Sequence, residues 1–272
     1  MIYSVAGELN NKYLISQRPY RSPHHGASQP SLVGGGSKAK PGEITLAHNG
    51  VLFLDEVAEF NKSILDALRQ PMETGNIKIS RVNSHVTYPA KFQLIAAMNP
   101  CRCGYFGDGE RTCSKAPSCA EQYQSKISGP ILDRIDLIIE VPQVDIKQLN
   151  PKNSLSLPAL HLAQTSTEIK EKILRAKEMQ AKRYSQYSIL TNSEATGEII
   201  NETADLSKEA SSLLEEAMQK FKFSTRAYYR LIKVARTAAD LDNNTHILSA
   251  HMSEAISYRK VNYYNKLMQR PS

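Results

Sequence analysis

The sequence contains no tryptophan and only four cysteines among 272 residues. Four cysteines in so long a chain do not make a disulfide framework, and we expect a reducing compartment such as the cytoplasm. No apolar run approaches the roughly 20 residues that a membrane-spanning helix needs, and the first residues lack the basic-then-apolar layout of a secretory signal. These absences argue against a membrane protein and against a small secreted disulfide-rich protein.

The composition is that of an ordinary folded chain with a basic surplus. Hydrophobic residues make up 41% of the chain and charged residues 22%, which excludes a disordered polypeptide. The formal net charge is +7 and the isoelectric point is about 9.1. This surplus permits contact with nucleic acid but does not demonstrate it.

Three short apolar runs in the first half of the chain predict a parallel sheet. They are GVLFLDE (50–56), KFQLIAAMN (91–99) and IDLIIEVP (135–142), and they are rich in branched or aromatic side chains, as strands buried on both faces are. The segment 63–74 has helical spacing, so strand, helix and strand follow one another, which is typical of a right-handed crossover. Alternating apolar residues over 76–92 predict a hairpin.

The second half of the chain is predicted to be helical. Helices are expected over residues 167–184, 206–221, 224–242 and 249–260. On the third of these, the expected buried stripe consists of Ala227, Leu231, Val234, Ala238 and Leu241. The predicted organisation is an α/β domain over residues 1–148, a Pro- and Ser-containing linker over 149–165, and an all-α domain over 166–272.

The segment GVLFLDE carries the clearest chemical signal. It predicts a buried strand that ends in Asp55 and Glu56, at the edge of a parallel sheet where ligands of such folds bind. In nucleoside triphosphatases the Asp of such a pair holds Mg²⁺ through water, and the Glu polarises the attacking water. By pattern alone, a strand followed by a solvated acidic turn fits equally well.

Three more polar residues favour the nucleotide interpretation. Asn99 follows the next predicted strand, where its amide can orient the lytic water or contact the γ-phosphate. Arg134 lies just before the third predicted strand, and we expect it to be exposed at a domain rim. Arg226 begins a helix of the second domain, from which a guanidinium can reach a nucleotide held between domains. Each residue alone fits a turn or a surface charge, but the order and spacing favour a site.

Several segments of the sequence resemble those of a known family. The segments that carry the likeness are RPYRSPHHGASQPSLVGGG (18–36), KPGEITLAHNGVLFLDEVAEF (40–60), LDALRQPMETGNIKISR (65–81), YPAKFQLIAAMNPCRCGYFGD (88–108), ISGPILDRIDLIIEVP (127–142) and STRAYYRLIKVARTAADLD (224–242). They are similar to the Mg-chelatase-like AAA+ ATPases, and most closely to the bacterial ComM/YifB family. The resemblance implies a truncated AAA+ parallel-sheet core with β-hairpin insertions near 30–47 and 76–90, followed by an all-α C-terminal lid domain.

The resemblance also implies roles and partners. Asp55 and Glu56 correspond to the Walker B pair, Asn99 to sensor 1, Arg134 to an arginine finger that acts on a neighbouring subunit, and Arg226 to sensor 2. The implied cofactors are ATP and Mg²⁺. The implied assembly is a ring of identical chains, expected to be a hexamer, that couples ATP hydrolysis to branch migration on DNA during natural transformation.

One motif of such enzymes is not present in these 272 residues. A phosphate-binding P-loop reads G-x-x-x-x-G-K-[ST], and GGGSKAKPG (34–42) fails because Lys38 follows Ser37 instead of Gly. In the family, the counterpart of IYSVAG (2–7) lies downstream of that motif. We therefore expect the chain to begin inside the AAA+ core and, alone, neither to bind nor to hydrolyse ATP appreciably. Either a separate upstream fragment supplies the P-loop or the chain is a remnant.

Two rival functions stay open at this stage. A metal-chelatase subunit that inserts Mg²⁺ into a porphyrin would share the same fold. A non-catalytic module that oligomerises or binds partners would keep the fold and lose the chemistry. Stimulation by branched DNA would favour DNA remodelling over a metal-chelatase subunit. ATPase activity that appears only after mixing with an upstream fragment would argue against a non-catalytic module.

The four cysteines form one sequence cluster. Cys101, Cys103, Cys113 and Cys119 have the spacing C-x-C-x₉-C-x₅-C. Four thiols suffice for a tetrahedral structural Zn²⁺ site, although C-x-C is a less usual spacing than C-x₂-C and reduced cysteines without metal are common. Both interpretations stay open.

Two further groups of residues have less specific patterns. Residues 217–239 contain six basic residues and no acidic residue, which predicts either an electropositive helix face or a solvated basic face. The six are Lys220, Lys222, Arg226, Arg230, Lys233 and Arg236. Only Arg226 gains a role from the family. The pair His24 and His25 is expected to have a structural loop role, because adjacent side chains diverge and no acidic residue lies nearby in the sequence.

Overall fold

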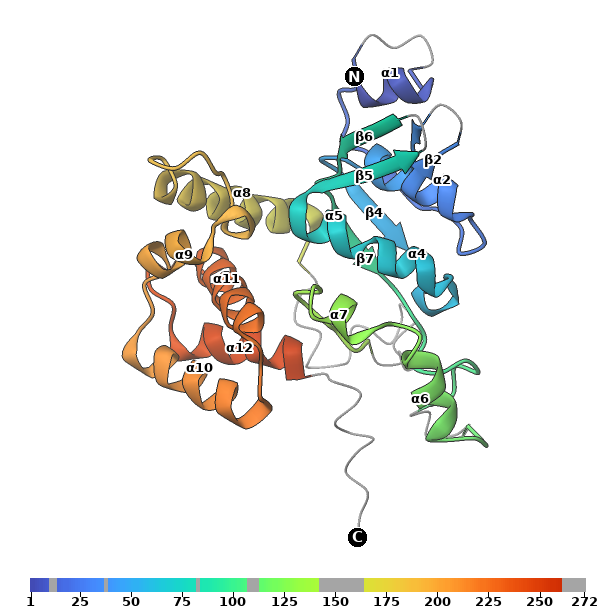
Figure 1. Cartoon of the computed structure of the whole chain (residues 1–272). Coiled ribbons are helices and arrows are strands. Elements are labelled where there is room, and N and C mark those ends of the chain that lie inside the picture. Colours follow the sequence, from blue (N-terminus) through green and yellow to red (C-terminus); the bar gives the residue numbers. More distant parts are fainter. Residues whose placement is uncertain (10–13, 37–38, 82–83, 107–112, 142–163, 261–272) are drawn as a thin grey trace, which may run out of the picture. The chain divides into compact units, whose positions relative to one another are not determined.

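A computed structural model describes residues 1–9, 14–36, 39–81, 84–106, 113–141 and 164–260 (Figure 1). These residues fall into two compact units, one with residues up to Ile135 and one with residues from Asp136 onward. Most of the linker that was predicted over 149–165 lies outside the described residues. Each unit is built around its own hydrophobic core.

The first unit contains a three-stranded parallel sheet in the order β1-β4-β7. Its strands are β1 (Tyr20–Arg21), β4 (Val51–Leu54) and β7 (Gln93–Ala96). The two longer strands confirm two of the predicted strands, and their register pairs Leu54 with Ala96. The prediction that they are buried on both faces is wrong for β7, in which Gln93, Ile95 and Ala96 are exposed. Strand β1 comes very close to Gly50, where an added Cβ would lie 2.0 Å from the carbonyl oxygen of Pro19. A glycine is therefore needed where β1 and β4 meet.

The first unit contains seven α-helices and one 3₁₀ helix among its described residues. They are α1 (Ile2–Ala6), α2 (Gln29–Val33), α3 (Glu43–Leu46), the 3₁₀ helix η1 (Val57–Glu59), α4 (Lys62–Ala67), α5 (Arg69–Thr74), α6 (Ser118–Gln124) and α7 (Gly129–Leu132). Buried side chains of α2, α3, η1, α4 and α7 share one hydrophobic core with β4. The helix predicted over 63–74 is confirmed as α4 followed by α5. The break has a local cause, because the ring of Pro71 excludes the helical hydrogen bond to Ala67, where α4 ends. Leu52, Leu54 and Leu65 lie in the core beneath these helices.

Two antiparallel hairpins confirm the predicted insertions. In the first, β2 (Gly34–Gly35) pairs with β3 (Lys40–Pro41), and in the second, β5 (Asn76–Arg81) pairs with β6 (Ser84–Pro89). Gly34 has a φ of 100°, and an added Cβ there would lie 2.6 Å from the Ile79 side chain. The glycine-rich segment thus packs as a hairpin, and it has no resemblance to a phosphate loop between a strand and a helix.

The strand predicted over 135–142 is wrong for its described residues, 135–141, which adopt no regular structure. An extended segment becomes a strand only by pairing with a neighbour, and here the N–H of Ile138 is donated to the carbonyl oxygen of Tyr258 at 3.1 Å. Three of its apolar side chains are exposed, with Leu137, Ile139 and Val141 at 46%, 65% and 84%. The apolar pattern was present, but the described residues offer it no strand partner.

The second unit is helical, as predicted. It contains α8 (Ser166–Arg183), the 3₁₀ helix η3 (Asn192–Glu194), α9 (Gly197–Thr203), α10 (Lys208–Phe221), α11 (Thr225–Leu241) and α12 (Ser249–Lys260), which run from yellow to red in Figure 1. Four of these confirm the predicted helices. Side-chain caps fix several starts, including a capping box between Thr165 and Glu168 and a cap from Ser207.

The buried face of α11 is rotated from the predicted stripe. Ala227 and Leu231 are buried as expected, but Leu241 is 41% exposed. The buried face continues instead through Ala235 and Ala239, with polar residues between them. None of the helices among the described residues is both long and apolar enough to cross a membrane.

Candidate nucleotide and metal sites

Three parallel strands bring polar residues to one edge of the sheet. Asp55 and Glu56 follow β4, and Asn99 lies three residues beyond the end of β7. The two strand ends are tied together, because the N–H of Ala97 donates to Leu54 at 2.9 Å and the N–H of Val57 donates to Ala97 at 2.9 Å. The structure therefore brings the predicted carboxylate pair and the predicted amide to the same edge, where ligands of parallel sheets bind.

The backbone at Glu56 has an unusual conformation. Its φ and ψ are 49° and 45°, in the left-handed region that a non-glycine residue seldom occupies. The carboxylate of Asp55 holds this turn, since its Oδ1 accepts the N–H of Glu56 at 2.9 Å. Both side chains are exposed. Left-handed residues at ligand-binding edges point side chains where a regular strand could not.

His25 makes a contact that its sequence pattern does not reveal. Its Nδ1 lies 3.2 Å from Oε2 of Glu56, and its ring lies 4.1 Å from that of His24, centroid to centroid. The expectation that the two rings diverge and have no acidic partner is therefore wrong. The cause is β1, whose carboxyl end delivers His25 to the same edge as Glu56. A strand of two residues leaves no periodic signal from which this contact could have been predicted.

Arg134 is not exposed at a rim, contrary to expectation. Only 13% of its side chain is exposed, and its guanidinium forms an ion pair with Glu73 and donates to the carbonyl oxygen of Pro130 at 2.6 Å. In this arrangement Arg134 ties the residues after α7 to α5. Any contact with a neighbouring subunit would require the pair with Glu73 to open.

Arg226 belongs to the second unit. It is exposed in the first turn of α11, and the side chain of Ser224 caps this helix by accepting the N–H of Ala227 at 3.3 Å. A guanidinium in the first turn of a helix, near the positive end of the helix dipole, suits an anionic ligand.

The four cysteines converge, as their sequence cluster predicted. All four sulfur atoms lie within 4.8 Å of one another, and those of Cys101 and Cys103 are 3.2 Å apart. Cys101 and Cys113 are buried and Cys103 is exposed. Such a cluster can hold a metal ion, since thiolates are the ligands that Zn²⁺ prefers in structural sites.

The thiols of this cluster have opposite pKa shifts. Burial alone would raise the pKa of Cys101, but hydrogen bonds from the Cys103 thiol and from backbone N–H groups bring it below its usual value. The N–H groups belong to Cys103, Gly104 and Phe106. A backbone hydrogen bond at Tyr105 acts to lower the pKa of Cys103, yet its contacts with two cluster sulfurs raise it to about 12. Without metal, the cluster therefore keeps a proton at neutral pH, and metal binding would release it.

Two family models match most of the chain. The model described as "Magnesium chelatase, subunit ChlI" matches residues 1–149, and the model of its C-terminal part matches residues 163–259. The chain belongs to the magnesium chelatase subunit ChlI family. The fold class predicted from the sequence, a parallel-sheet AAA+ core followed by a helical domain, agrees with that membership.

The chain is similar to several curated proteins. "Competence protein ComM" of Haemophilus influenzae is 46% identical over 94% of this chain and 47% of the relative. YifB of Escherichia coli is 43% identical over 90% of this chain and 46% of the relative. "DNA replication licensing factor Mcm6" of Drosophila melanogaster is 22% identical over 79% of this chain and 25% of the relative. The chain spans about half the length of the two bacterial relatives.

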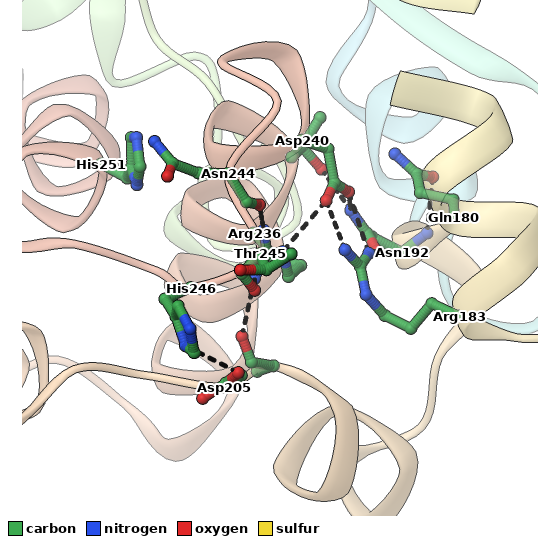
Figure 2. Close-up of polar contacts among 12 residues, drawn as sticks. Gln180, Arg183, Asn192, Asp205, Arg236, Asp240, Asn244, Thr245, His246 and His251 are labelled. Carbon is green, nitrogen blue, oxygen red and sulfur yellow. Dashed lines mark hydrogen bonds and ion pairs between the residues drawn. The ribbon is translucent and has the colours of Figure 1, made fainter. Parts of the chain in front are cut away.

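The basic residues on α11 of this magnesium chelatase family member do not form an electropositive face. Arg236 is fully buried and donates to the carbonyl oxygen of Ala204 at 3.0 Å and to Asp240 at 3.1 Å, as Figure 2 shows in part. Arg183 binds the same carboxylate with a second hydrogen bond at 3.0 Å. A buried Arg and an exposed Arg look alike in a sequence, so neither expected face of the run describes Arg236.

Two other basic residues of the run also have protein partners. Arg230 forms an ion pair with Asp136, and the Nζ of Lys233 donates to the carbonyl oxygen of Ser193 at 3.0 Å. Burial, together with the nearby positive charge of Arg230, lowers the pKa of Lys233. Of the four basic residues from 226 to 236, Arg226 is the one that is exposed.

The edge residues fit Mg²⁺ in their chemistry. Asp55 and Glu56 offer exposed carboxylate oxygens, the ligands that Mg²⁺ takes directly or through water. The glycine-rich segment with Gly34 does not form a cradle for the β- and γ-phosphates, because it is folded into a hairpin. The described residues of the first unit therefore supply carboxylates and an amide but no phosphate-binding loop.

Proposed function

We propose that the chain forms the carboxylate and amide half of an AAA+ nucleotide site, whose ATP hydrolysis drives the remodelling of branched DNA. The observation that carries this proposal is the shared sheet edge, at which Asp55, Glu56 and Asn99 follow two adjacent parallel strands. The names of the relatives support the biological setting, one being a competence protein and another a DNA replication licensing factor.

Each edge residue has a distinct role in this proposal. Asp55 binds the Mg²⁺ of the nucleotide through water, and it also holds the Glu56 turn by accepting its N–H. Glu56 accepts a proton from the attacking water, and Asn99 orients that water with its amide. Mg²⁺, when bound, neutralises charge on the phosphates. Glu56 must leave the imidazole of His25 to reach the water, so His25 holds Glu56 in a resting position until nucleotide binds.

The phosphate cradle of the proposed site comes from a polypeptide segment outside these 272 residues. The chain contains no P-loop motif and spans about half of its bacterial relatives. The backbone N–H groups and the Lys of a P-loop provide most of the binding for β- and γ-phosphates. Arg134 and Arg226 complete the proposed site with positive charge, Arg134 in a neighbouring subunit of a ring and Arg226 from the helical unit.

The test is a fusion protein. A segment of a ComM-family relative that carries the P-loop is joined before Met1, and phosphate release is measured with and without branched DNA. We expect ATP hydrolysis by the fusion, stimulation by branched DNA, and no turnover by the chain alone. Glu56→Gln in the fusion should reduce the rate by roughly 100-fold or more while nucleotide binding persists.

Glu59→Gln provides the matched control. Glu59 is a neighbouring exposed carboxylate that lies 3.2 Å from the Nζ of Lys126, and the proposal gives it no catalytic role. The fusion with Glu59→Gln should hydrolyse ATP at nearly the unmodified rate. A folded fusion that binds no ATP, or a Glu56→Gln fusion as active as the Glu59→Gln one, would refute the proposed function.

A further inference from the structure

The spacing of the four sulfur atoms in the cysteine cluster is close to that of a tetrahedral metal site. Four sulfurs at about 2.3 Å from one Zn²⁺ in a tetrahedron lie about 3.8 Å from each other. The four sulfurs here all lie within 4.8 Å of one another before any ion is added, so only small side-chain rotations separate them from that geometry. A cluster of several irons would need sulfurs farther apart, because the irons and sulfides lie between them.

Hydrophobic packing does not account for this convergence. The buried residues around the cluster are few, and they amount to Cys101, Cys113 and Ala120 with Phe106 partly buried against them. The described residues from 100 to 117 form turns and contain no helix or strand of their own. So small a core is far too little to hold a loop of this length, and small domains of this kind rely on metals or disulfides.

The loop also has the features of a metal knuckle. A tight turn follows Cys101, and it is closed by the N–H of Gly104, which donates to the carbonyl oxygen of Cys101 at 3.1 Å. Cys103 is exposed, so an ion can reach the cluster from solvent.

The cluster is connected to the proposed nucleotide edge by two short links. Cys101 lies two residues after Asn99, and Cys119 lies in the first turn of α6. From the other end of α6, the buried side chain of Gln124 donates from Nε2 to the carbonyl oxygen of Pro100 at 2.8 Å. An ion that joins Cys101 to Cys119 would therefore close a loop through α6 and back to the Asn99–Pro100 turn.

We propose that Cys101, Cys103, Cys113 and Cys119 bind one Zn²⁺ ion, which fastens the Asn99–Pro100 turn to α6. The ion is structural and takes no part in chemistry. Its consequence is positional: the amide that follows β7 is held at the sheet edge by the metal on one side and by Gln124 on the other. The inference goes beyond the nucleotide function, and its test needs no nucleotide, so either can fail alone.

The first experiment measures metal content. The full chain is purified without chelators, its zinc is measured by elemental analysis, and its thiols are titrated with a mercurial reagent. We expect about one Zn²⁺ per chain, released as four thiols react. Replacement with Co²⁺ should produce the intense visible absorption of tetrahedral thiolate-bound cobalt. Cys113→Ser should lose most of the metal, whereas Ser118→Ala, a neighbouring exposed change, should keep it.

Three results would overturn the metal site. They are a chain with no metal and four reactive thiols, a chain with the cysteines paired as disulfides, and a chain that holds iron in place of zinc. Because Cys113→Ser could unfold the loop for other reasons, the wild-type thiol titration and the Co²⁺ spectrum decide the question without any variant.

The second experiment tests the positional role by hydrogen exchange of the full chain. Removing zinc with a strong chelator should speed exchange in the segment 97–104 by roughly tenfold, and the hairpin β5–β6 should not change. Gln124→Met should accelerate the same segment with zinc still bound. If chelation removes the zinc and the segment 97–104 exchanges as before, the ion does not hold the Asn99–Pro100 turn, and this part of the proposal is wrong.

Discussion

The two units use contacts between ionisable side chains in opposite ways. In the first, His25 and Glu56 meet at a sheet edge with 35% and 52% of their side chains exposed. In the second, Arg236 and Asp240 meet with neither side chain exposed. An exposed pair can exchange its partner for water or a ligand at little cost, whereas a buried pair has no such alternative. The first arrangement suits binding, and the second holds helices together.

The buried pair is part of a network in which each member is satisfied several times. Asp240 accepts hydrogen bonds from Arg183, Arg236 and Asn192, the last at 2.9 Å. Gln180 continues the network by accepting the N–H of Asn192 at 3.1 Å (Figure 2). The network joins α8, η3 and α11, so it fixes how these helices of the second unit pack against each other.

The largest expected effect comes from breaking this network. Arg236→Met leaves the carboxylate of Asp240 buried with fewer donors, and also leaves the carbonyl oxygen of Ala204 without its partner. We expect the free energy of unfolding of the helical unit to fall by about 3–5 kcal/mol. Urea denaturation followed by circular dichroism would measure it. The matched control, Arg226→Met on the exposed face of the same helix, should change stability by less than about 0.5 kcal/mol.

A smaller loss is expected where the binding edge is assembled. Gly50→Ala places a Cβ 2.0 Å from the carbonyl oxygen of Pro19, so β1 must move away from β4. We expect a loss of roughly 1–3 kcal/mol in the stability of the first unit, as in other overpacked sites. Hydrogen exchange in β1 and β4 should accelerate. Gly129→Ala, where an added Cβ meets nothing within 4 Å, is the control. Equal stability of the two variants would contradict the close approach.

Some features of the two units could be predicted from the sequence, and others could not. Strands β4 and β7 were predictable from short apolar runs, and the β5–β6 hairpin and four long helices from residues that repeat with a local period, whereas the β2–β3 hairpin followed only from the family resemblance. The carboxylate pair was predictable because it directly follows a strand, and Asn99 because it follows the next one. All of these depend on neighbours in the sequence.

The failures depend on distant contacts. His25 reaches Glu56 through β1, which is two residues long and exists only by pairing with β4. The segment 135–141 has the apolar pattern of a strand but no strand partner among the described residues. Arg236 is buried because carbonyl groups from the loop 244–245 and from α9's end converge on it. Tertiary pairing decided each case, and local patterns carry no record of it.

The exposed pair should be nearly neutral for stability. His25→Ala removes the contact with Glu56, and because both side chains are largely solvated we expect a change below about 1 kcal/mol in the free energy of unfolding. In the P-loop fusion described above, the same variant should change the ATPase rate, since Glu56 loses its resting partner. His85→Ala, an exposed residue on β6, is the control for both measurements. If His25→Ala lost as much stability as Arg236→Met, the exposed pair and the buried pair would not differ as we expect.

The smallest expected effect is a pH dependence at His48. Burial, and then the positive charge of Lys91, lower the pKa of this histidine, and its Nδ1 accepts the N–H of Lys91 at 3.1 Å. The unfolded chain binds a proton at His48 near pH 6.5, but the folded chain resists it until a lower pH, so stability falls as the pH drops below about 6.5. His48→Asn keeps an acceptor and cannot titrate there. Its denaturation midpoint should therefore fall less than the wild-type midpoint between pH 7 and pH 5, by an amount worth less than about 1 kcal/mol because the ring is only partly buried. Parallel slopes for the two proteins would show that His48 is protonated as easily in the folded chain as in the unfolded one.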